Sequence, residues 1–182
     1  MAAPDEFRIA PATEQDLPVI LRLIKGLATY ERLSHEVVAT EASLHESLFG
    51  PKPVAEVVIG YVGAEPVGFA VWFHNYSTFL GRPGLYLEDL FVLPPWRGRG
   101  FGRQLLTHLA QIAVGGGCGR MEWTVLDWNE PAQRFYLSLG AQAMEAWKIY
   151  RVTGEALRAL ATGSSSTRVR RRPSFPETNT TG

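Results

Sequence analysis

Residues 85–106 read LYLEDLFVLPPWRGRGFGRQLL and contain the sharpest local signal in the chain. Residues 85–92 are mostly aliphatic and aromatic, as is typical of a buried strand. A helix is expected over residues 102–114, because apolar side chains recur there at helical spacing and three consecutive glycines follow. Between them lies RGRGFG at residues 97–102, with glycines at alternate positions. The stretch therefore predicts a strand, a glycine loop and a helix in succession.

The glycine loop has the features of a phosphate-binding loop. Glycine lacks a Cβ, so successive backbone N–H groups can turn toward one point. The helix that follows adds its free N–H groups and the positive end of its dipole. Arg97 and Arg99 supply charge, which completes an anion nest suited to a pyrophosphate. A dinucleotide fingerprint fits worse, because it needs G-x-G-x-x-G and an acid about 20 residues further on. A P-loop also fits worse, because it needs Gly-Lys-Ser/Thr and Gly102 is followed by Arg103. A strand-to-helix turn without a ligand is the alternative interpretation.

The rest of the chain adds strands and helices on both sides of this stretch. Further strands are expected at residues 7–10, 56–62, 67–75, 121–126 and 144–152, and further helices from Thr13, over residues 41–48 and over residues 132–139. This order predicts an α/β (α+β) fold, with a mixed, mostly antiparallel sheet flanked by helices on both faces.

Length and composition fit a single domain over residues 1–161. Residues 162–182 are rich in Gly, Ser, Thr, Arg and Pro, which predicts a disordered basic tail. The chain has no apolar run of about 18 residues, no N-terminal secretory pattern, and one cysteine, Cys118. These features predict a cytoplasmic protein that neither enters a membrane nor forms an intrachain disulfide.

The charges favour a small cationic ligand. Four of the 18 basic residues fall in the last twenty positions, against one acid, so the body carries 14 basic and 17 acidic residues. A body of net charge −3 suits a cation better than nucleic acid. The four histidines show no ligand spacing with one another or with Cys118, so no metal site is expected.

With the motifs in place, the chain resembles the GNAT acetyltransferases. Their motif, Arg/Gln-x-x-Gly-x-Gly/Ala, is filled by Arg97, Gly100 and Gly102. The resemblance narrows to the diamine acetyltransferase group, which comprises polyamine and thialysine N-acetyltransferases. Four stretches carry it: LRLIK at 21–25, YLED at 86–89, RG at 97–98, and WNEP at 128–131 leading to Phe135 and Tyr136.

The resemblance implies the following roles. Acetyl-CoA would be the co-substrate, held by Leu90, Phe91, Val92, Arg97, Gly98, Arg99, Gly100, Phe101, Gly102, Asn129 and Tyr136. The substrate would contact Tyr30, Glu31, Glu88, Glu122, Trp123 and Thr124. Glu88 would bind the amine and, with water, remove its proton, and Tyr136 would protonate the leaving thiolate. The resemblance also implies a homodimer, for which residues 144–152 offer an apolar edge strand.

The substrate is expected to be a thialysine-like or lysine-like amine, with polyamines as the second possibility. Thr78 stands where a polyamine enzyme would carry an acid, and the chain is shorter near Glu145. YST at residues 76–78 and LDWN at residues 126–129 look more like the thialysine branch.

Direct transfer to an amine agrees with the residues themselves. An alkylammonium, with a pKa of about 10.4, must lose a proton before it attacks, and a carboxylate beside it both holds the cation and assists that loss. Neutral tyrosine, with a pKa of about 10, can donate a proton to a thiolate. Two alternatives stay open: a protein lysine or N-terminal acetyltransferase, and a CoA-binding sensor without turnover, in which Tyr136 would be a core residue.

Overall fold

A five-stranded sheet forms the centre of the fold in the computed structural model, which describes residues 6–164. The strand order is β1-β2-β3-β4-β5. The first four strands pair antiparallel, and β5 runs parallel to β4. The strands are β1 (Phe7–Pro11), β2 (Glu56–Val62), β3 (Glu65–Ser77), β4 (Arg82–Val92) and β5 (Met121–Trp123). The mixed, mostly antiparallel sheet predicted from the sequence is confirmed.

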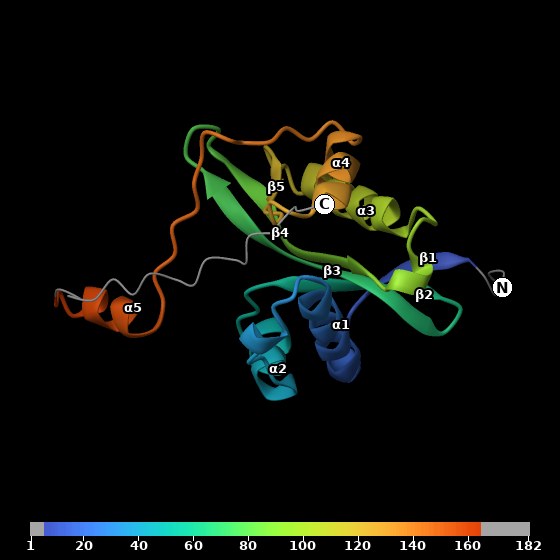
Figure 1. Cartoon of the computed structure of the whole chain (residues 1–182), viewed down its shortest axis with the longest axis horizontal. Coiled ribbons are helices and arrows are strands. Elements are labelled where there is room, and N and C mark those ends of the chain that lie inside the picture. The colour runs from blue at the N-terminus through green and yellow to red at the C-terminus, as the bar shows by residue number, and fades with distance from the viewer. Residues whose placement is uncertain (1–5, 165–182) are drawn as a thin grey trace, which may run out of the picture. The chain divides into compact units, whose positions relative to one another are not determined.

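Helices cover both faces of this sheet. The helices are α1 (Leu17–Tyr30), α2 (Glu41–Phe49), α3 (Phe101–Gly115), α4 (Glu130–Leu137) and α5 (Gly154–Ala161). In Figure 1, α1 and α2 lie on one side of the strands and α3 lies on the other. Ile20 and Leu23 of α1, and Leu105 and Leu109 of α3, are fully buried. α1 and α3 therefore turn their apolar stripes toward the sheet, as the spacing in the sequence predicted.

The core beneath α1 brings the end of that helix close to β4. Ile20 and Leu23 pack in one cluster with Val57, Ile59, Phe69, Val71 and Phe91 of the sheet. A Cβ at Gly26 would lie 3.0 Å from the Phe91 ring. Because Gly26 has no side chain, the last turn of α1 can pack directly against β4.

The ladder between β3 and β4 contains a β-bulge. Val71 pairs with Asp89, whereas the next residue, Trp72, pairs with Leu87. Glu88 therefore has no partner on β3 and is the extra residue of the bulge. Because directly paired residues share a face, Asp89 lies with Val71 on the α1 face, while Leu87 lies with Trp72 on the other. The bulge thus reverses which face of the sheet the alternate side chains of β4 point to after Glu88.

The other edge of β4 is only partly covered. β5 pairs with Leu85, Tyr86 and Leu87 and ends at Trp123, three residues earlier than the sequence predicted. β4 continues to Val92. Within the part of the chain that the structure describes, residues 88–92 have no strand partner on the β5 side. Their backbone groups on that edge are available to another partner.

The chain divides into two compact units, Met1–Arg134 and Phe135–Gly182. The first contains the sheet with α1, α2 and α3, and the second contains the end of α4 and α5. The predicted tail at 162–182 falls almost wholly outside the described residues, which end at Ser164. The domain boundary at residue 161 therefore stays a prediction.

The strand predicted at residues 144–152 is wrong. These residues form no strand, and their large side chains are exposed, including Trp147, Ile149 and Tyr150. Apolar and aromatic side chains raise strand propensity, but a strand forms only where an edge pairs with it. These residues are followed by α5, with Thr153 as its N-cap. The sequence pattern did not predict this helix.

Candidate active site

The bulge in β4 sets two neighbouring acids in different environments. Glu88 is exposed, whereas Asp89 is largely shielded from solvent. Burial, and then the negative charges of Glu88 and Glu31, raise the pKa of Asp89 from an ordinary 3.8 to about 6. A carboxyl group with this pKa can both hold a cation and exchange a proton near neutral pH.

Glu31 completes an acidic cluster, a name used below for Glu31, Glu88 and Asp89. Glu31 is the C-cap of α1, and its backbone N–H donates to the carbonyl of Leu27 at 2.9 Å. Burial raises the pKa of its carboxyl group. Shielded carboxylates that repel one another are costly unless they bind a cation. The acidic cluster therefore has the chemistry of an ammonium site.

The glycine loop lies between β4 and α3, as predicted. Gly98 and Gly100 have φ angles of 75° and 82°, in the left-handed region that favours glycine, and Gly100 is the N-cap of α3. A Cβ at either glycine would meet no atom within 4 Å. The space above the loop is open, and the free N–H groups of the first turn of α3 begin there. The loop thus fits an anion such as a pyrophosphate.

Aromatic rings hold both arginines of the loop. The Arg97 guanidinium lies 4.3 Å from the centre of the Tyr30 ring, and its Nε donates to the Val92 carbonyl at 2.9 Å. The Arg99 guanidinium lies 4.7 Å from the centre of the Trp96 ring. Phe101 is buried and stacks on Phe7, with 4.2 Å between the ring centres, so its side chain belongs to the core and only its backbone faces the loop.

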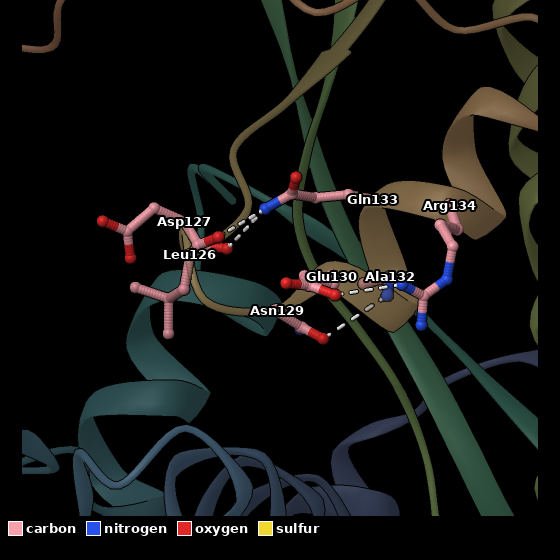
Figure 2. A network of polar contacts seen from close by, with 7 residues as sticks. All are labelled: Leu126, Asp127, Asn129, Glu130, Ala132, Gln133 and Arg134. Carbon is pink, nitrogen blue, oxygen red and sulfur yellow. Dashed lines mark hydrogen bonds and ion pairs between the residues drawn. The ribbon is translucent and has the colours of Figure 1, made fainter. Parts of the chain in front are cut away.

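Asn129 caps the start of α4 (Figure 2). Its Oδ1 accepts from the backbone N–H of Ala132 at 3.4 Å. The same oxygen accepts from the Tyr30 hydroxyl at 3.0 Å. Gln133 donates to the carbonyls of Leu126 and Asp127 at 3.2 and 2.7 Å, which ties the preceding loop to the helix. Only 7% of Asn129 is exposed. This polar network fixes the amide of Asn129 in one orientation.

The remaining predicted substrate residues lie on or after β5. Glu122 is engaged by protein partners: its Oε2 accepts from Arg120 at 2.9 Å and from Asn75 at 3.0 Å. Trp123 is partly buried and Thr124 is exposed. The carboxylate of Glu122 therefore holds β5 against the β3–β4 hairpin, which the sequence pattern did not indicate.

Tyr136 lies on α4, in the second unit, beside Phe135, with 5.4 Å between the ring centres. Leu139 and Ala141 donate their backbone N–H groups to its carbonyl.

Asp89 is the candidate residue that sequence reasoning did not select. Glu88 and Asp89 occupy opposite faces of an ideal strand, so the sequence indicates that at least one acid turns inward without indicating which. The signal that decides it is the bulge, which alternation of residue types does not reveal.

Residues 6–164 contain no group of three His, Cys, Asp or Glu side chains placed to hold a metal ion. In the same residues, no helix is long and apolar enough to cross a membrane.

Replacing the carboxyl group of Asp89 by an amide should stabilise the folded protein while removing a group from the candidate active site. We expect Asp89→Asn to raise the free energy of unfolding at pH 8 by on the order of 2–3 kcal/mol, because the folded state no longer holds a shielded charge. Above pH 6 the Asp89 carboxyl of the wild type is ionised in both the folded and the unfolded state, so the full free-energy cost of shielding its charge is present. Below about pH 4 it is protonated in both states and the cost is absent.

Urea unfolding at pH 5 and pH 8 measures this difference, which should be larger at pH 8. Asp127→Asn, at an exposed position, is the matched control and should change little at either pH. An Asp89→Asn variant less stable than the wild type at pH 8 would show that the carboxylate is paired in the native state.

Comparisons with known proteins agree with this geometry. The acetyltransferase (GNAT) family model matches residues 22–141. The chain is 38% identical over 165 residues to a thialysine N-epsilon-acetyltransferase of Mus musculus, which covers 85% of this chain and 96% of the relative. It is 35% identical over 198 residues to an L-ornithine N5-acetyltransferase of Arabidopsis thaliana, which covers 84% and 87%.

Among solved structures, an integron cassette protein from the mobile metagenome of V. cholerae superposes with a TM-score of 0.73 at 28% identity, over 85% of this chain and 97% of that one. The resemblance drawn from the sequence is confirmed. The chain belongs to the GNAT family of N-acetyltransferases, enzymes that use acetyl-CoA as co-substrate.

Proposed function

We propose that this enzyme transfers the acetyl group of acetyl-CoA to the primary amine of a small cationic substrate, and that a thialysine-like or lysine-like amine is preferred to a polyamine. The observation that carries the proposal is the acidic cluster. Glu88 and Asp89 lie on β4, the strand that leads into the glycine loop, and Glu31 lies at the end of α1. The acids suit an alkylammonium, and the loop suits a pyrophosphate.

The acyl donor would lie along the uncovered edge of β4. The N–H groups from Gly98 to Gly102 and the first turn of α3 would hold the pyrophosphate, with charge from Arg97 and Arg99. The backbone of Leu90, Phe91 and Val92 would hold the pantetheine chain. Asn129 would contribute its amide nitrogen, because its oxygen is already engaged by Tyr30. The open space above Gly98 and Gly100 supports this placement.

The acidic cluster would bind the amine and take up its proton. Glu88 is exposed and receives the ammonium directly or through water, and Asp89, with its pKa near 6, stabilises the cation from the α1 side. Loss of one proton from the ammonium frees the nitrogen lone pair, which forms the bond to the acetyl carbon. The bond from that carbon to sulfur breaks, and the thiolate receives a proton from Tyr136. The nitrogen gives up its second proton as the amide forms, and a proton from solvent restores the tyrosine hydroxyl, so one proton is released in each turnover.

The names of the two relatives support a side-chain amine of an amino acid, since one is named for thialysine and the other for L-ornithine. A protein lysine or N-terminal acetyltransferase is the second candidate. The cluster of three acids fits a free cationic amine better than a neutral peptide. A CoA-binding sensor would need neither the acids nor Tyr136.

We also propose a homodimer. Residues 144–152 do not form the apolar edge strand expected at a dimer interface. The exposed apolar side chains of the same residues support the homodimer, since an apolar patch of this kind favours association.

The substrate order is tested by the release of CoA from acetyl-CoA with thialysine, lysine, ornithine, putrescine, spermidine, aminoglycosides and peptides. We expect thialysine or a lysine-like amine to give a higher kcat/KM than spermidine. The physical reason is Thr78, an exposed residue without charge where a distal ammonium would otherwise find an acid. Spermidine turning over tenfold faster would contradict this order, and turnover of peptides alone would favour the second candidate.

Tyr136→Phe tests the general acid, because it removes one hydroxyl and keeps the ring. General acid catalysis is worth typically 10²–10⁴-fold, so we expect kcat to fall at least about thirtyfold, with little change in the KM for the amine or in the melting temperature. Tyr150→Phe, on a tyrosine that is 91% exposed, is the matched control. A folded Tyr136→Phe enzyme with more than half of the wild-type kcat would exclude the acid role.

A further inference from the structure

The resemblance implies that Tyr30 touches the substrate, but in the structure its hydroxyl and one face of its ring both contact other side chains of the protein. Its hydroxyl donates to Asn129 Oδ1 at 3.0 Å, across 99 positions of sequence. The Arg97 guanidinium covers its ring at 4.3 Å. The ring of Trp128 lies 5.9 Å away, tilted by 55°. The side chain thus joins three segments of the first unit: the end of α1, the glycine loop and the start of α4.

Both polar partners of Tyr30 belong to the proposed acyl-donor site. Arg97 is tethered by its Nε to the Val92 carbonyl and also lies 5.4 Å from the centre of the Phe91 ring. These contacts fix the base of the guanidinium, and the Tyr30 ring fixes its face. The oxygen of Asn129 is held by the Tyr30 hydroxyl, so the amide nitrogen must point to the opposite side.

The segment that follows Tyr30 also contacts the loop before α4. Arg32 has a φ of 62°, a conformation that most residues other than glycine avoid. Its guanidinium lies 5.4 Å from the centre of the Trp128 ring. Leu33 donates its N–H to the Ala28 carbonyl at 2.8 Å, which closes the end of the helix. Segment 30–33 therefore contacts Trp128 and Asn129 through the side chains of Tyr30 and Arg32.

We infer that Tyr30 is a positioning residue for the acyl donor: it orients the Arg97 guanidinium and the Asn129 amide toward the bound CoA. The inference rests on the proposed function, because it assumes that CoA lies along the glycine loop. A cation–π contact and a hydrogen bond of this kind each correspond to about a three- to tenfold change in an equilibrium constant.

Calorimetric titration with CoA tests this without turnover. We expect Tyr30→Phe, which removes only the bond to Asn129, to weaken CoA binding about threefold, and Tyr30→Leu, which also removes the ring, to weaken it about tenfold. In an Arg97→Met background, Tyr30→Leu should weaken binding only about threefold, because the ring contact with Arg97 is already gone and the bond to Asn129 is what remains to be lost. Tyr76→Leu, on an exposed tyrosine, is the control and should bind CoA as the wild type does.

The KM values separate positioning from substrate contact. With acetyl-CoA saturating, both Tyr30 variants should keep the KM for the amine within twofold. A raised KM for the amine with unchanged CoA affinity would overturn the inference and restore Tyr30 as a substrate contact. If Tyr30→Leu lost the same CoA affinity with and without the Arg97→Met substitution, that result would also overturn it. A wild-type protein that does not bind CoA would contradict the proposed function itself.

Discussion

The bulge between β3 and β4 is the constraint on which the rest of the site depends. One extra residue, Glu88, shifts the pairing so that Leu87 and Asp89, two positions apart, lie on opposite faces of the sheet. Asp89 thereby reaches the face covered by α1, where the charge of Glu31 acts on it. An unbroken ladder would place Asp89 with Leu87 on the other face, away from the end of α1.

The same strand joins the two halves of the proposed chemistry. Just before the bulge, at residues 85–87, β4 is paired with β3 on one edge and β5 on the other. After the bulge, within residues 6–164, β3 is the one strand that pairs with it. Glu88 and Asp89 precede Arg97, the first residue of the glycine loop, by nine and eight residues, and in the proposed function the backbone between them is available to an acyl donor. Burial of Asp89 raises its pKa and so lowers the stability of the folded state when the carboxyl is ionised. Such a loss of stability is common at functional sites, where a shielded charge is used to bind a ligand.

Much of the fold could be predicted from the sequence because its signals are local. The strand, glycine loop and helix of residues 85–114 follow from residue types and spacing, and α1 follows from its apolar period. The strand expected at 144–152 failed because pairing depends on an edge elsewhere in space. Which of Glu88 and Asp89 turns toward α1 could not be predicted for a related reason: a bulge depends on the partner strand. The contacts of Tyr30 with Arg97 and Asn129 join residues far apart in sequence, which no local pattern indicates.

The proposed acyl-donor site is tested most directly by calorimetric titration of acetyl-CoA into the wild type, Gly100→Val and Gly115→Val. Gly100 needs a positive φ and a bare backbone, whereas a Cβ at Gly115, on the last residue of α3, also meets open space but without a positive φ. We expect Gly100→Val to bind at least about tenfold more weakly while it stays folded, because the side chain would stand where phosphate must approach. Gly115→Val should bind as the wild type does. Equal affinity in all three folded proteins would show that acetyl-CoA does not lie on the glycine loop.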